Sequence, residues 1–321
     1  MLDESYHELL AQVAAMYYEQ GLTQAAIAQQ LGLSRVKVYR LLEQARAHQV
    51  VQIKIDWPIG RDQVLERSLQ HTFGLREALV LKTSSRNHVP VLQRLGKLCA
   101  RYLERILTDG MTMALCLGSS TYEVINAISA DFRAKVRIAQ ATGSIPFAVR
   151  EFDSAAVAHQ LAQKLGGEVL YLSSPLIADS VEAAQVLRSQ SEIRRTLVAA
   201  GQADVALLGI GNLDPLTSGF VAAGFLTPEV LAALVADGAV GDMAGQIFTL
   251  SGELHPCPFN QRVIGITFDD LRRIPTTIAI ARGSAKVRAI LGALHSGTIN
   301  VLCTDDQTAT EILSAKGAWK P

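Results

Sequence analysis

The chain has 321 residues, of which 49% are apolar, and its 30 basic and 30 acidic side chains cancel to a net charge of zero. This length predicts about two domains, and the apolar fraction suffices for a large core and argues against general disorder. Zero net charge excludes a protein-wide attraction to nucleic acid or to a membrane surface. The N-terminus is unlike a signal peptide, and no apolar run reaches the roughly 18 residues of a membrane span. We therefore expect no membrane attachment.

Four cysteines are spread widely among apolar neighbours and form no CxxC pair; they are Cys99, Cys116, Cys257 and Cys303. This pattern predicts reduced, buried thiols in a cytoplasmic protein. The fragment His255-Pro256-Cys257 has no companion pair of ligands in the sequence, so we expect a loop there and no metal site.

Two short helices joined by a tight turn are predicted by QAAIAQQLGLSRVKVYRLLE at residues 24–43. Gly32 permits the turn, because a residue without Cβ adopts positive φ without a clash. Ser34 can cap the second helix. A preceding helix over residues 6–20 adds enough apolar residues for a three-helix core. The inward-facing residues of the two short helices return at helical spacing; they are Ile27, Ala28, Leu31, Leu33, Val38, Leu41 and Leu42.

The second helix leaves a basic set of residues facing outward at its N-terminal end. Arg suits guanine edges and Lys suits phosphates, so this set is typical of a recognition helix in the major groove of DNA. An ordinary helical hairpin with a solvated basic face would show the same pattern. The preceding helix, and a strand-like run over residues 50–55 that can form a wing, favour DNA binding. The candidate DNA-binding residues are Ser34, Arg35, Val36, Lys37, Tyr39 and Arg40.

A linker is predicted at residues 56–60, where Asp-Trp-Pro-Ile-Gly breaks the pattern. It separates a helix-turn-helix head at residues 1–57 from a larger domain at residues 58–321. A short amphipathic helix over residues 61–73 opens the larger domain and ends at Gly74. Its apolar side, which includes Leu69, fits either core packing or a dimer seam.

The larger domain alternates short aliphatic runs with helical stretches. Continuous apolar strands that alternate with helices predict an α/β fold, with a doubly wound, mostly parallel sheet covered on both faces. Segment 238–273 is the least regular part, and we expect a loop-rich insertion near a ligand. The predicted strands are residues 78–82, 111–117, 136–142, 168–172, 205–210, 276–281 and 300–303. The predicted helices are residues 89–107, 121–129, 154–165, 181–202, 228–237, 284–294 and 306–315.

Two strand-to-helix turns carry polar groups at strand ends, where ligands bind in open α/β sheets. The turn Gly118-Ser119-Ser120-Thr121 offers a phosphate a close backbone approach, hydroxyl groups and the free N–H groups of the next helix. Residues 282–286, Arg-Gly-Ser-Ala-Lys, open a helix with two cations. Each turn is equally explained as an ordinary connection with a serine cap, and the sequence leaves both interpretations open.

Taken together, these features resemble the SorC family of bacterial transcriptional regulators over nearly the whole chain. The resemblance rests on GLTQAAIAQQLGLSRVKVYRLLEQA in the head, LGSST at residues 117–121, LLGIGN at 207–212, GAVGDMAGQIF at 238–248 and NVLCTDDQTATEIL at 300–313. It implies a second domain similar to the phosphosugar isomerase and deaminase fold. The partners that it implies are double-stranded operator DNA, a small sugar, polyol or sugar phosphate as effector, and further copies of the chain in a homodimer or homotetramer.

Carried over by position, the resemblance places phosphate-binding loops at Gly118, Ser119, Ser120 and Thr121, with Gly143 at the next strand end. It places Asp242 near ligand hydroxyls and Lys286 on a phosphate. The chemistry agrees, because a carboxylate accepts well from a diol and lysine is a suitable point charge for phosphate. Asp242 is also explained as a turn residue after a glycine.

One stretch departs from the family pattern. Some relatives carry a lysine just before the glycine that ends the third strand, where it can form a Schiff base with an aldehyde sugar. This chain has Gln140-Ala141-Thr142-Gly143 there, without a lysine, so we expect a non-covalent ligand. The glycine-rich continuation is replaced by Ser144-Ile145-Pro146-Phe147, whose aromatic bulk can narrow the pocket.

The sequence therefore predicts a transcriptional regulator of a carbohydrate or polyol catabolic operon, controlled by a sugar or sugar-phosphate effector, with no catalytic residue and no cofactor. The alternative is a sugar-phosphate isomerase- or deaminase-like enzyme with an accessory helical head. The fold does not separate these classes, but such an enzyme has no evident use for a DNA-binding head. Asp242 also lacks a companion acid or histidine nearby in sequence that would tune a general base. A constitutive DNA-binding protein whose α/β domain only oligomerises is a third possibility.

Overall fold

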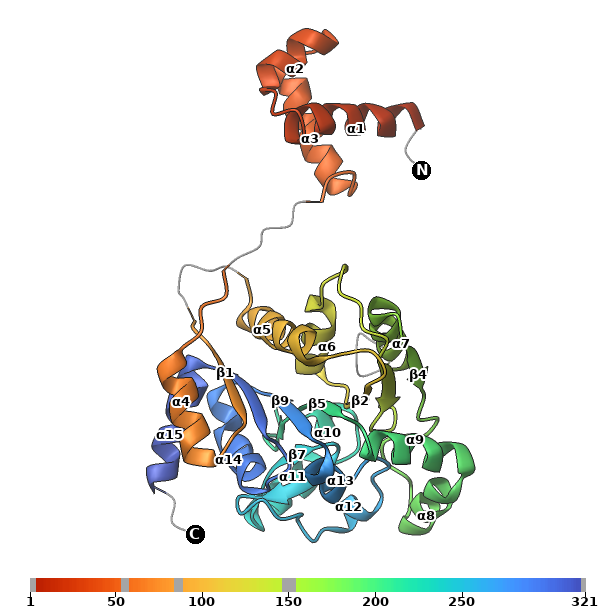
Figure 1. The fold of residues 1–321 in the computed structure, drawn as a ribbon, viewed down its shortest axis with the longest axis vertical. Coiled ribbons are helices and arrows are strands. Elements are labelled where there is room, and N and C mark those ends of the chain that lie inside the picture. The colour runs from red at the N-terminus through yellow and green to blue at the C-terminus, as the bar shows by residue number, and fades with distance from the viewer. Residues whose placement is uncertain (1–3, 53–57, 84–88, 146–153, 319–321) are drawn as a thin grey trace. The chain divides into compact units, whose positions relative to one another are not determined.

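The computed structural model describes residues 4–52, 58–83, 89–145 and 154–318 (Figure 1). The chain divides into two compact units, Met1–Pro58 and Ile59–Pro321. None of the described helices is long and apolar enough to cross a membrane.

The first unit is a three-helix domain formed by α1 (Glu4–Tyr18), α2 (Gln24–Leu31) and α3 (Arg35–Ala47). Ser34 caps α3 as predicted, because its hydroxyl accepts from the N–H of Lys37 at 3.2 Å. Gly32 ends α2 with a φ of 65°, which is the left-handed turn that the sequence predicted. The three helices share one buried core, made of Leu10, Val13, Ala14, Met16, Ile27, Ala28, Val38, Leu41, Leu42 and Ala45.

The run predicted as a wing forms no strand over residues 50–52, and residues 53–55 lie outside the described part of the chain. Val50 and Val51 instead pack against the core of the three helices. The N–H of Val51 donates to the carbonyl of Ala45 at 3.1 Å, so this backbone group closes the end of α3 rather than joining a sheet.

The second unit is built on a seven-stranded sheet with the order β1-β10-β9-β5-β2-β3-β4, in which every pairing is parallel. The predicted parallel sheet is therefore confirmed, and each strand falls within or beside a predicted run. The strands are β1 (Glu77–Leu81), β2 (Thr112–Leu115), β3 (Arg137–Gln140), β4 (Glu168–Leu170), β5 (Val205–Gly209), β9 (Thr276–Ile280) and β10 (Val301–Asp305).

Helices cover both faces of this sheet (Figure 1). Successive strand residues point to opposite faces, so each strand contributes to two cores. One face carries the larger side chains and packs against α5 (Val91–Ile106), α6 (Ser119–Ala127) and α7 (Ser154–Leu165). The other face carries alanines from most strands and packs against α4 (Gln63–Phe73), α9 (Ser191–Gly201), α14 (Val287–His295) and α15 (Asp306–Ala318). Helices α8 (Val181–Ser189) and α11 (Pro228–Ala236) lie outside these two layers.

Segment 238–273, predicted to be loop-rich, contains regular structure. Strands β7 (Ala239–Met243) and β8 (Gln246–Thr249) form a hairpin, and β6 (Gly211–Asn212) pairs with β7 to complete a three-stranded antiparallel sheet. Ala244 and Gly245 both have positive φ, as a two-residue hairpin turn requires. The short helices α12 (Pro258–Gln261) and α13 (Phe268–Arg273) follow. The prediction was wrong here because alanine is an uncommon residue in such a turn.

Leu69 of α4 packs inside the second unit. Its side chain is fully buried in the chain's own core, where α4 packs between β1 and α15. Leu69 is therefore a core residue and not part of a dimer seam.

The chain enters the second unit along the edge of the sheet. The N–H of Asp62 donates to the carbonyl of Val80 at 2.9 Å, and the N–H of Lys82 donates to the carbonyl of Gly60 at 2.8 Å. Residues 60–62 thus pair antiparallel with the end of β1 and cover part of its exposed edge.

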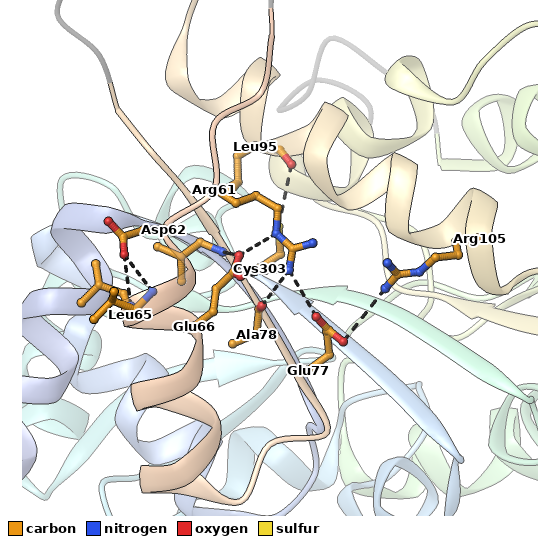
Figure 2. Close-up of polar contacts among 11 residues, drawn as sticks. Arg61, Asp62, Leu65, Glu66, Glu77, Ala78, Leu95, Arg105 and Cys303 are labelled. Atoms are coloured by element: carbon orange, nitrogen blue, oxygen red, sulfur yellow. Dashed lines mark hydrogen bonds and ion pairs between the residues drawn. The ribbon is translucent and has the colours of Figure 1, made fainter.

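An ion-pair cluster holds this entry point (Figure 2). The Arg61 guanidinium donates to the Glu66 carboxylate through Nε at 2.7 Å and through Nη2 at 3.0 Å, and to Glu77 at 3.2 Å. The bond to Glu66 raises the pKa of Arg61. Glu66 is only 5% exposed and also accepts from the N–H of Val80 at 2.9 Å. Its charge is therefore fully engaged inside the protein.

Arg61→Met is expected to lower the free energy of unfolding by about 2–4 kcal/mol, because the buried Glu66 carboxylate would keep only the N–H of Val80. Chemical denaturation measures this loss. The control is Arg137→Met, which removes an ion pair with Glu168 whose side chains are 50% and 65% exposed. Exposed pairs contribute less than about 1 kcal/mol. Equal losses in the two variants would contradict the assignment.

Candidate functional site

A cavity of about 220 Å³ opens at the carboxyl ends of β2, β3 and β5. Strands β3 and β4 extend the sheet from one side of β2, whereas β5 and β9 lie on its other side. The loop after β2 leads to α6 on one face, and the chain after β5 leads through β6 to β7, which packs with α14 on the other face. Connections that diverge to opposite faces leave a crevice between them, which is the usual ligand position in such sheets.

Six of the seven predicted effector-binding residues line this cavity; they are Gly118, Ser119, Ser120, Gly143, Asp242 and Lys286. Thr121 does not line it, because its side chain is fully buried. The Thr121 hydroxyl accepts from the N–H of Gly118 at 2.8 Å and lies 3.1 Å from the carbonyl of Cys116. Thr121 therefore shapes the loop instead of reaching a ligand.

The first turn of α6 borders the cavity. The first intrahelical bond of this nine-residue helix runs from the N–H of Tyr122 to the carbonyl of Gly118 at 2.9 Å. The N–H groups of Ser119 and Ser120 precede that bond, and both residues line the cavity. Free N–H groups and the positive end of the helix dipole make this position suitable for an anion.

Two glycines are required by the close packing of the cavity wall. A Cβ on Gly143 would lie 2.2 Å from the carbonyl oxygen of Pro175. A Cβ on Gly211 would lie 1.8 Å from Oδ1 of Asp242, its partner across the β6–β7 pair. The absence of a side chain at Gly211 therefore lets the Asp242 carboxylate lie directly on the backbone of β6.

Lys286 places a partly buried cation near that carboxylate. Its Nζ donates to the carbonyl of Ile210 at 2.6 Å. Burial lowers the pKa of Lys286, and the charge of Asp242 partly offsets this effect by raising it. An anionic ligand would favour the charged form of Lys286, because its negative charge would replace the solvation that burial removes.

The second predicted cation of this turn has another role. Arg282 does not line the cavity, and its Nε donates to Asp305 at 2.7 Å. Ser284 likewise bonds to Glu311 at 2.8 Å. Of the predicted turn at residues 282–286, Lys286 alone faces the cavity.

Several cavity residues were not predicted from the sequence as ligand contacts. Asn212 ends the motif LLGIGN, and Gln140 lies in the stretch where some relatives carry a lysine; neither pattern by itself indicates a ligand contact. Aromatic bulk comes from Phe220 and Phe225, whereas Pro146 and Phe147 lie outside the described residues. The further lining residues include Gln140, Thr142, Ile145, Ser154, Leu176, Asn212, Thr217, Phe220 and Phe225.

Cys116 also lines the cavity, but burial raises its pKa to about 12. It is therefore a thiol at neutral pH and a poor nucleophile. All four cysteines are free and buried, as predicted. In the part of the chain that the structure describes, His, Cys, Asp and Glu form no cluster that could hold a metal.

The first unit carries the candidate DNA-binding residues on α3. Arg35, Lys37, Tyr39 and Arg40 are exposed, and Val36 is 61% exposed. The intervening Val38 is fully buried in the core of the three helices. The outward face predicted for this helix is therefore available to a partner.

Comparisons with known proteins agree with this architecture. The model of the family described as "Putative sugar-binding domain" matches residues 58–314. The chain belongs to this family, and it is a SorC-type transcriptional regulator.

Three relatives show how far the similarity extends. The transcriptional regulator LsrR of Enterobacter sp. (strain 638) is 32% identical over 316 residues, which cover 97% of this chain and 94% of that protein. The deoxyribonucleoside regulator of Bacillus subtilis is 28% identical, with 98% and 99% covered. The crystal structure of the full-length sorbitol operon regulator SorC from Klebsiella pneumoniae has a TM-score of 0.72 and 27% identity, and the match covers 98% of this chain and all of that one.

The lowered pKa of the partly buried Lys286 leads to a prediction about pH. Because the folded-state pKa of Lys286 lies below its ordinary value of 10.5, the unfolded chain binds more protons than the folded protein between these two values. The free energy of unfolding of the wild type should therefore rise with pH in this window, relative to that of Lys286→Met. Urea denaturation from neutral pH to 10.5 measures the difference. The exposed Lys135→Met is the control and should show no such trend; a flat difference for Lys286→Met would contradict the burial argument.

Proposed function

We propose that the chain regulates a carbohydrate or polyol catabolic operon, and that a small sugar or sugar phosphate in the cavity controls its grip on double-stranded operator DNA. One observation carries this proposal: a single chain combines an exposed basic helix with a cavity that presents helix N–H groups, a lysine and a carboxylate. The first element suits DNA, and the second suits a phosphorylated polyol.

The cavity residues would contact the ligand at two ends, its phosphate and its hydroxyl groups. Its phosphate would meet the N–H groups of Ser119 and Ser120, with Lys286 supplying the charge. Asp242 would accept hydrogen bonds from its hydroxyls, because a carboxylate offers several acceptor positions. Relatives named for deoxyribonucleosides and for sorbitol support a carbohydrate or polyol as the ligand class. Among the described cavity residues, those at the end of β3 include no lysine, which supports non-covalent binding.

Catalysis is not part of this proposal. Among the described residues that line the cavity, Asp242 is the one carboxylate and no histidine is present. An isomerase with an accessory head would have to use Asp242 as its base. Conversion of fructose 6-phosphate to glucose 6-phosphate by the purified protein would support that alternative.

The small size of the DNA-binding head bears on assembly. One three-helix head contacts too few base pairs for useful specificity, so the chain should act as a homodimer or homotetramer on a palindromic site. A cytoplasmic location fits its free, buried cysteines.

The effector is tested with glucose 6-phosphate, fructose 6-phosphate, ribose 5-phosphate and glucitol 6-phosphate. At least one should raise the melting temperature and change operator affinity, because a ligand that binds only the folded state stabilises it by mass action. Lys286→Ala and Asp242→Ala should lose both responses and bind operator normally without ligand. Lys135→Ala, an exposed control, should keep both. Unchanged ligand affinity in both cavity variants would contradict the site.

DNA binding is tested on an operator selected from a random-sequence library. Arg35→Ala should weaken binding by roughly 1–3 kcal/mol if the guanidinium contacts a guanine edge in bidentate fashion. Lys37→Ala should weaken binding to all sequences and reduce the slope of affinity against salt by about one. Fluorescence anisotropy over a salt series measures both effects. Arg137→Ala, in the second unit, is the control; wild-type affinity in both α3 variants would show that another surface binds DNA.

A further inference from the structure

Two buried carboxamides line the cavity on either side of β2. Gln140 ends β3 and is 4% exposed, whereas Asn212 ends β6, which continues from β5, and is 8% exposed. Neither residue has a role in the phosphate and hydroxyl contacts described above.

The orientation of each carboxamide is determined by the backbone. Oε1 of Gln140 accepts from the N–H of Leu172 at 2.8 Å. Oδ1 of Asn212 accepts from the N–H of Asp214 at 3.0 Å and from the hydroxyl of Thr217 at 3.0 Å. A backbone N–H only donates, so the oxygen of each amide must face it and the NH₂ group must take the other side.

Both NH₂ groups lack a hydrogen-bond partner among the residues that the structure describes. Partly buried asparagines away from the cavity differ in this respect. Nδ2 of Asn260 donates to the carbonyls of Ile247 and His255, each at 2.8 Å, and Nδ2 of Asn300 donates to that of Pro275 at 2.9 Å.

An unpaired amide atom alone does not indicate a ligand. Oε1 of Gln246, which lies outside the cavity, is also buried without a partner among the described residues. Gln140 and Asn212 differ from Gln246 in their position, because their unpaired donors belong to side chains that line the cavity.

We propose that Gln140 and Asn212 select the effector by donating hydrogen bonds to two of its oxygen atoms. The site then takes a fully oxygenated sugar phosphate and rejects the deoxy analogue that lacks either oxygen. This inference rests on the proposed function and specifies its ligand class.

Apolar side chains beside Gln140 strengthen the discrimination between the parent ligand and its deoxy analogue. Leu115 is the in-register neighbour of Gln140 on β2, and Leu115 and Cys116 both line the cavity. A ligand without an oxygen at this point would leave the Gln140 donor against apolar groups. An unpaired buried donor is the usual reason why a hydrogen-bonding site rejects an analogue that lacks one polar group.

The experiment uses calorimetry on the full chain. The probes are the member of the four-phosphate panel that gives the largest thermal shift and its monodeoxy analogues. The wild type should bind the parent at least about tenfold more tightly than one or more of these analogues. Gln140→Met should weaken the binding of the parent about tenfold. It should not change the affinity for the analogue that lacks the oxygen bound by Gln140, because the two groups are coupled partners in a double-mutant cycle.

Controls separate selection from structure. Gln246→Met makes the same change at a buried glutamine outside the cavity and should preserve every affinity. If Gln140→Met does not fold, Gln140→Glu replaces it, because its carboxylate still accepts from Leu172 while the NH₂ donor is gone. Its added negative charge weakens every phosphate ligand alike, so the measured quantity is the affinity ratio of the parent to the analogue, which should fall to about one. Asn212→Asp does the same at the second position.

Each remaining outcome is decisive. Equal binding of the parent and all monodeoxy analogues by the wild type would overturn the inference and leave the proposed function standing. Equal weakening of the parent and every analogue by Gln140→Met would assign Gln140 a structural role and also overturn it. If no member of the panel shifts the melting temperature, the proposed function fails, and this inference fails with it.

Discussion

The reversal of strand order around β2 is the constraint on which the cavity depends. The chain adds β3 and β4 on one side of β2 and then returns to place β5 and β9 on the other. The connections after β2 and β5 must therefore diverge to opposite faces of the sheet, and no backbone fills the space between their first residues. The polar groups of the candidate site reach this space from α6, β3, β6, β7 and the turn at Lys286, so the sheet holds together elements that are distant in sequence.

Buried charge is used in two ways within the same unit. Glu66 accepts hydrogen bonds from Arg61, which also pairs with Glu77, and from a backbone N–H, so its charge is compensated in the folded chain. Lys286 has a carbonyl and the partial influence of Asp242, and its lowered pKa shows that burial is incompletely compensated. The first arrangement stabilises the entry of the chain along β1. The arrangement at Lys286 leaves an electrostatic cost that an anionic ligand can relieve. Such uncompensated groups are common in functional sites.

The carboxamides extend this distinction from charge to hydrogen bonds. Asn260 and Asn300 use both ends of their amide groups to join backbone segments. Gln140 and Asn212 use only the oxygen for this purpose, and the same bonds that anchor the side chain determine which way the donor points. Positioning and recognition are thereby combined in one residue, since the ligand-facing group needs no further support.

Local chemistry was sufficient to predict much of this protein from its sequence. Helical spacing, the cap at Ser34 and the turn at Gly32 depend on residues within one or two turns, and so does the alternation of apolar strands with helices. The cavity positions of Gly118–Ser120 and of Lys286 also follow from strand ends that lead into helices, while Asp242 came from family resemblance. Tertiary structure alone decided that Arg282 is occupied by Asp305, that Leu69 belongs to the core, and that Gln140 presents its donor to the cavity. Gln140 and Leu172 are 32 residues apart, so the direction of that amide depends on a contact that exists only after β3 and β4 have paired.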